Sequence, residues 1–203
     1  MARTMLALAL AGASLFATPA LAQGEGGEPA GQRGREKRDR DQGNPEALKA
    51  KVVELLQALG AGQADKAKEL LAALAPDEKV VEDILTPEGK KAIGEKLVAA
   101  AKEALAGEPK EVAERLKLDP TLSNVVVFSA STEDLMSMEA ETDAAMHFAG
   151  GLKRASRWMK PRYRFYAVVL RKPEAEEGGN HVQLFVYSQE RFVFLGKVWR
   201  LED

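Results

Sequence analysis

The sequence predicts an α+β domain whose N-terminal helices pack on one face of a curved antiparallel sheet, formed mainly by the C-terminal half. Two observations carry this prediction. Between residues 45 and 118, apolar residues recur at steps of three and four, the spacing of a helix face. Between residues 163 and 198, apolar residues alternate with their neighbours, which is typical of strands. We expect residues 45–203 to form a single domain.

Residues 1–22 have the features of a secretory signal peptide. One arginine precedes an apolar stretch over residues 5–16, and Ala20 and Ala22 have the spacing that signal peptidase accepts. We expect cleavage before Gln23 and export to the periplasm or the extracellular medium. The alternative is an uncleaved anchor, but the stretch is shorter than the roughly 20 residues that cross a bilayer. We expect no transmembrane segment after cleavage.

Residues 23–44 are predicted to be a disordered, charged linker. The segment is rich in glycine and contains no valine, isoleucine, leucine or aromatic residue, so it cannot bury enough apolar surface to fold. Bases and acids are interleaved between residues 33 and 41. We interpret the linker as a solvated tether; a weakly basic arm that touches a membrane surface or a polyanion is the alternative.

A series of helices should follow the linker. Asn44 can cap the first helix, Pro45 suits its first turn, and Gly60 should end it. Capping and helix-starting residues place the later helices near Asp65, Pro76, Thr86 and Pro109.

The middle of the chain is predicted to change from helix to strand. Residues 125–128 are a continuous β-branched and aromatic run, which indicates a buried strand. Residues 129–138 should form a loop or one helical turn, because Ser131 to Asp134 are typical of a helix start. Residues 139–148 are ambiguous and weakly favour a strand, and residues 152–158 favour a short helix.

Three strands should close the chain as an antiparallel meander. Residues 163–170 carry apolar side chains on both sides, as expected for a central strand. The alternating segments 182–187 and 192–198 are separated by Gln189 and Glu190, which we expect to form a tight turn.

This order of elements resembles the nuclear-transport-factor-2-like (SnoaL-like) cone fold. The resemblance is carried by several helices followed by long paired strands, RYRFYAVVL and then HVQLFVYSQERFVFLGKVWRL. The same stretches resemble the ends of exported bacterial proteins that have no assigned function. The resemblance implies a cone-shaped domain but no single activity, because that superfamily includes enzymes, binding modules and structural proteins. We match no residue here to the catalytic Asp–His arrangements of its enzymes.

Sequence motifs for catalysis, metal binding and nucleic-acid binding are missing. The chain has no cysteine, and its two histidines, His147 and His181, do not have the spacing of metal ligands. We therefore expect no metal, no cofactor and no catalytic residue. The balanced charge, −2 for the whole chain, does not predict a nucleic-acid partner.

One charged segment is a candidate anion-binding site. Residues 144–173 contain no acid, whereas the residues just before them are acidic. We expect Arg162 and Arg164 to project from the same side of a strand, where they could hold a carboxylate, phosphate or sulfated ligand. The full candidate set is Arg157, Trp158, Lys160, Arg162 and Arg164. The alternative is a solvated face, or pairing with the acidic residues before it.

These features favour an exported, non-enzymatic binding or interaction module whose partner is an anionic ligand or an envelope protein. A small cofactor-free hydrolase or isomerase, with a pocket between helices and sheet and with His147 or His181 at its centre, is one alternative. A structural envelope protein that forms homo-oligomers through its sheet is the other.

Overall fold

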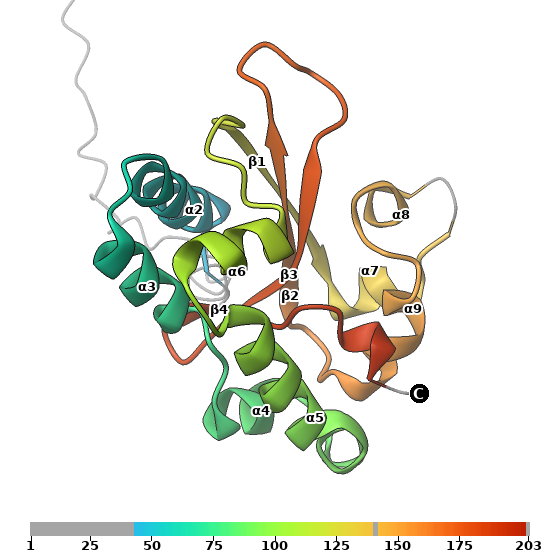
Figure 1. Ribbon diagram of the computed structural model, residues 1–203. Coiled ribbons are helices and arrows are strands. Elements are labelled where there is room, and N and C mark those ends of the chain that lie inside the picture. Colours follow the sequence, from blue (N-terminus) through green and yellow to red (C-terminus); the bar gives the residue numbers. More distant parts are fainter. Residues whose placement is uncertain (1–42, 140–141, 202–203) are drawn as a thin grey trace, which may run out of the picture.

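The computed structural model describes residues 43–139 and 142–201 (Figure 1). The predicted signal peptide and almost all of the predicted linker lie outside these residues. Five helices come first: α2 (Pro45–Gly60), α3 (Ala64–Ala73), α4 (Glu78–Ile84), α5 (Pro87–Leu105) and α6 (Pro109–Leu116). None of the described helices is long and apolar enough to cross a membrane.

A four-stranded antiparallel sheet follows the helices, so the predicted α+β class is confirmed. Its strands are β1 (Asn124–Ser131), β2 (Arg164–Arg171), β3 (Asn180–Ser188) and β4 (Arg191–Phe194), and they pair in the order β1-β2-β3-β4. The short elements between β1 and β2 are α7 (Thr132–Met136), α8 (Asp143–His147), α9 (Leu152–Ala155) and η1 (Ser156–Trp158). The last element is η2 (Val198–Arg200).

Two helices, α2 and α5, start where their capping residues predict them. The Asn44 side chain accepts a hydrogen bond from the Glu46 amide at 2.9 Å, and Pro45 opens α2. The Thr86 hydroxyl accepts from the Gly89 amide at 3.0 Å at the start of α5. These bonds satisfy amide groups that have no partner within the helix.

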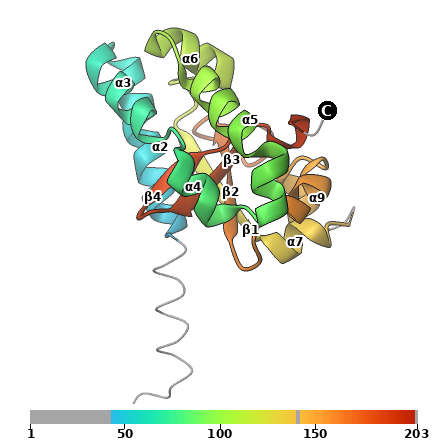
Figure 2. The same ribbon diagram turned by 90° about the horizontal axis from the view of Figure 1, so that it is seen from below.

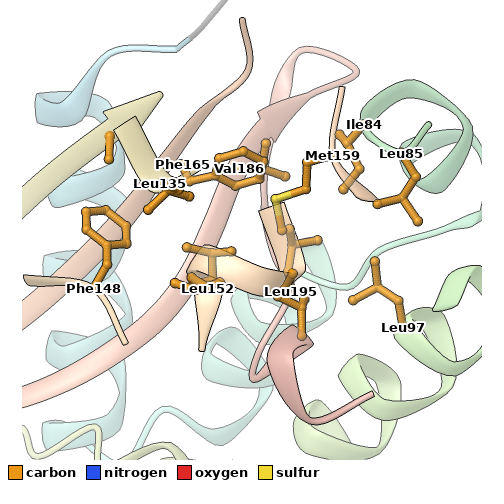
Figure 3. Packing of buried hydrophobic residues seen from close by; sticks show 14 of the residues in the cluster. Ile84, Leu85, Leu97, Leu135, Phe148, Leu152, Met159, Phe165, Val186 and Leu195 are labelled. Carbon is orange, nitrogen blue, oxygen red and sulfur yellow. The ribbon is translucent and has the colours of Figure 1, made fainter. Parts of the chain in front are cut away.

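Both faces of the sheet are covered by helices, so the prediction that helices lie on one face is wrong. Side chains alternate along β2, and Phe165 and Tyr166 enter two different apolar clusters. The Phe165 cluster includes side chains from α4, α5, α7 and α9, some of which are shown in Figure 3. The Tyr166 cluster includes side chains from α2, α3 and α6. Figure 2 shows α2 and α3 on one side of the strands and α7 and α9 on the other.

Two strand predictions need correction. Part of residues 139–148, weakly predicted as a strand, forms the helix α8, because Thr142 caps it with a 3.2 Å hydrogen bond from the Ala145 amide. The last strand ends at Phe194, short of the predicted residue 198. Gly196 then adopts a φ of 66°, which turns the chain away from the sheet and into η2.

Candidate functional site

The predicted basic segment lies at the end of the α9–η1 region and at the start of β2. The Arg157 guanidinium carbon lies 4.5 Å from the centre of the Trp158 ring, a cation–π geometry. Trp158 is half-buried against the Phe165 cluster, and its carbonyl accepts a 2.8 Å hydrogen bond from the Thr86 amide. Trp158 thus connects the segment to the start of α5.

Lys160 and Arg162 contact acidic residues or their backbone. The Lys160 ammonium donates to the Glu82 carbonyl at 2.7 Å, and the Arg162 amide donates to the Glu133 carboxylate at 3.0 Å. Arg162 has a φ of 68° and precedes β2, so it does not share a strand side with Arg164 as expected. The Arg164 guanidinium instead donates to the Ser129 hydroxyl of β1 at 3.0 Å. The segment therefore makes internal contacts, and the predicted ligand site in it remains a prediction.

The two histidines occupy unrelated places. The His147 ring stacks on Phe128, with ring centres 3.3 Å apart and planes 12° apart. His181, at the start of β3, is exposed and lines a groove in the surface. Among the described residues, no group of three or more histidine, cysteine or acidic side chains is placed to hold a metal ion.

That groove, about 470 Å³ in volume, is the candidate functional site. Its walls come from α5, the end of α6, the start of β3, and the segment that follows β4 through η2. Two long-range bonds hold the walls together. The Asn180 side chain donates to the Lys117 carbonyl at 3.0 Å, and the Lys96 ammonium donates to the Leu201 carbonyl at 3.1 Å.

The floor of the groove is apolar and its rim is basic. Ala104 and Leu116 are half-buried on one wall, and Trp199 is half-buried on another. The basic side chains that line the groove are Arg115, Lys117, Lys197 and Arg200, together with His181. No lining residue carries a carboxylate; Glu202 and Asp203, which follow Leu201, lie outside the described residues.

Lys197 and Arg200 are the bases best placed to hold an anion. Both are exposed, and neither side chain has a hydrogen bond or an ion pair with any described residue. The Arg200 amide bonds to the Lys197 carbonyl at 2.9 Å in a 3₁₀ turn. Both residues line the groove from this one turn.

Two other polar side chains of the groove are already committed to the fold. The Arg115 guanidinium donates to the carbonyls of Glu103, Ala104 and Ala106, at 2.8, 2.9 and 3.1 Å, and so closes the C-terminal end of α5. The Gln183 amide donates to the His147 carbonyl at 2.7 Å and accepts from the Ala149 amide at 3.0 Å.

Sequence reasoning missed this groove. Its bases come from positions 115–117 and 197–200, which are separated by most of the sheet-forming half of the chain. Neither group forms a basic run in the sequence. The only local signal is Lys197 and Arg200 on either side of Val198 and Trp199.

No family model, no curated protein and no solved structure matches this chain. The resemblance to the nuclear-transport-factor-2-like fold therefore stays a prediction, and the function must be argued from the groove itself.

Proposed function

We propose that this protein is an exported, non-enzymatic binding module that holds an anionic ligand in the groove between α5, α6, β3 and η2. The single observation that carries the proposal is the pair Lys197 and Arg200, two exposed cations on one turn at a groove that no described carboxylate lines. Export of the protein is also part of this proposal. Ligand binding by the basic segment at residues 157–164 is a separate prediction.

The charged side chains favour anion binding more strongly in the groove than in the predicted basic segment. The Lys197 ammonium and the Arg200 guanidinium have no partner among the described residues, so an anion can bind them without displacing a contact to that part of the chain. Hydrogen bonds to an ionised ligand are about twice as strong as neutral ones. In the basic segment, by contrast, Lys160 and Arg164 already donate to protein atoms.

The lining favours binding over catalysis. General acid–base chemistry needs a titratable group and a second group that orients it. His181 is the one histidine that lines the groove, and among the described residues no carboxylate, hydroxyl or thiol lines the groove beside it. A hydrolase or isomerase centred on His181 is the second candidate function, because that side chain does face a groove.

The test is a binding titration with octanoate, using the purified chain in the form isolated from expressing cells. Tryptophan fluorescence reports on the groove through Trp199, and a Trp158→Phe background removes the other tryptophan. We expect Lys197→Gln with Arg200→Gln to weaken octanoate binding about tenfold or more, since losing charge-assisted bonds costs about 1.5–3 kcal/mol.

The matched control is Lys68→Gln with Lys91→Gln, which removes two exposed bases that do not line the groove. This control changes net charge equally and should leave the dissociation constant unchanged. Equal octanoate affinity in the two double variants would overturn the proposed site. Turnover of an ester or carbonyl probe that is lost in His181→Gln would favour the enzyme instead.

A further inference from the structure

We infer that the ligand of this groove is a single-chain amphiphile, with one anionic head held by Lys197 and Arg200 and an apolar chain lying along the groove floor. This inference rests on the proposed function and adds the chemical class of the ligand. It concerns a free amphiphile rather than a membrane surface.

The groove floor presents apolar surface that a ligand can remove from water. Ala100, Ala104 and Leu116 are half-buried, so part of each side chain still faces solvent. Behind them, Val182, Phe194 and Leu195 are almost fully buried and form a packed base. Covering such a surface with an alkyl chain is favourable because apolar area leaves water.

The polar groups of the floor leave a ligand little to bond with. The Gln183 side chain lines the floor, and its amide is bonded at both its nitrogen and its oxygen. A sugar or nucleoside, which has polar groups along its whole length, would bury them on this floor without partners, and that is costly. A molecule that is polar at one end only avoids this cost.

The position of the anionic head group follows from Lys197 and Arg200, which have no partner in the described part of the chain. Lys197 and Arg200 lie at the η2 end of the groove, beside Leu201, which the Lys96 ammonium holds to α5. Lys117 stands at the α6 end, where the Asn180 side chain bonds its carbonyl. Two cations on one turn can both contact a carboxylate or phosphate. At the other end, Arg115 lies close to Lys117 in the sequence but already donates to backbone carbonyls.

The size of the groove suits such a ligand. Its volume of about 470 Å³ falls within the usual range of about 300–1,000 Å³ for sites that enclose small molecules. Each methylene group that leaves water on binding contributes about 0.8 kcal/mol. Affinity should therefore rise about fourfold per added methylene, until the chain fills the floor.

The experiment is a titration series with hexanoate, octanoate, decanoate, inorganic phosphate and phosphatidylglycerol vesicles, each below its aggregation threshold where one applies. The purified chain is compared with Ala100→Asn, which places an amide on the floor. Ala99→Asn is the matched control, because Ala99 is exposed on the same helix and does not line the groove. Thermal midpoints confirm that both variants fold.

We expect the affinity to rise about fourfold per methylene in the native chain and in Ala99→Asn, and much less in Ala100→Asn. Suppose that all three carboxylates bind with equal affinity and that Lys197→Gln with Arg200→Gln removes this binding. The inference of an amphiphilic ligand would then be overturned, while the anion site would remain. If affinity still rises with chain length, and to the same values, in the variant with Lys197→Gln and Arg200→Gln, the proposed function is overturned instead. Binding to the phosphatidylglycerol vesicles but to none of the carboxylates would overturn the inference that the ligand is a free amphiphile.

Discussion

The Ser188 hydroxyl donates a hydrogen bond to the Asp83 carboxylate at 2.6 Å, across 105 positions of sequence. Ser188 is buried at the end of β3, and Asp83 lies on α4. The same carboxylate helps to raise the pKa of the Tyr163 phenol, just before β2. One carboxylate therefore ties α4 to the end of β3 and acts on the residue that precedes β2.

Replacing Ser188 by alanine should weaken this connection. We expect Ser188→Ala to lower the free energy of unfolding by about 1–2 kcal/mol, because a hydrogen bond to a charged group is lost at a partly buried site. Urea denaturation measures the change. The control is Ser137→Ala, whose hydroxyl bonds to the Glu133 carbonyl on the exposed side of α7. Similar losses in both variants would contradict a special role for the Asp83 bond.

Alkaline pH should destabilise the fold through Tyr163. Burial, and then the hydrogen bond and charge of Asp83, raise the pKa of Tyr163 well above its ordinary value of about 10. A raised pKa means that the folded state favours the neutral phenol. Its stabilisation is complete below about pH 10 and is lost as the pH rises toward the folded-state pKa.

Tyr163→Phe removes this titration. We expect the free energy of unfolding, measured in urea from pH 8 to 11.5, to fall less steeply above pH 10 in the variant. The difference in slope should be at most about 1.4 kcal/mol per pH unit, which corresponds to one proton. Identical slopes would show that the phenol is not protected by folding.

Gly89 should not tolerate a side chain, although it lies in a helix. A Cβ atom there would sit 2.3 Å from the Trp158 carbonyl oxygen and 2.8 Å from the Trp158 Cβ. We expect Gly89→Ala to destabilise the protein by about 1–3 kcal/mol through overpacking, where an exposed helical glycine would gain from alanine. Thermal unfolding measures the difference.

The control is Gly94→Ala in the same helix, where the nearest atom is a Val81 methyl carbon at 3.2 Å. A methyl group of a side chain can shift, so we expect a change within about 1 kcal/mol. If Gly89→Ala is as stable as Gly94→Ala, then α5 and η1 pack less closely than described.

Export predicts a defined N-terminus. Expression in a bacterium with a general secretory system should give a chain that begins at Gln23 in the fraction outside the cytoplasm, because Ala20 and Ala22 precede that bond. Intact-mass spectrometry measures the product. Ala22→Arg is the matched variant, and it should block processing. An unprocessed native chain in the membrane fraction would support the uncleaved anchor.

The hairpin turn shows how far local sequence can predict the fold. Gln189 and Glu190 join two alternating segments, and the structure places both at positive φ, 52° and 58°, with Ser188 paired to Arg191. The two-residue turn is thus confirmed, although neither residue is the glycine or asparagine that such turns favour. Strand alternation on both sides was sufficient to place it.

The α8 region shows where local sequence fails. Residues 139–148 contain no clear helical period, and the helix that forms there is only a short one, capped by Thr142. Tertiary contacts fix it: Phe128 stacks on His147, and Gln183 bonds on either side of Phe148. These partners lie on β1 and β3, so the segment alone could not reveal them.

The sequence by itself determined most of the helices and strands, because each depends on spacing within a few residues; α8 and the end of β4 are the exceptions. Tertiary structure decided which faces of the sheet the helices cover and how the cations that have no partner among the described residues come to line one groove. Phe165 and Tyr166 are neighbours, yet they enter different clusters once helices lie on both sides of β2. The groove likewise exists only because the chain after Gly196 turns back to α5, which brings Arg200 near a wall formed about a hundred residues earlier.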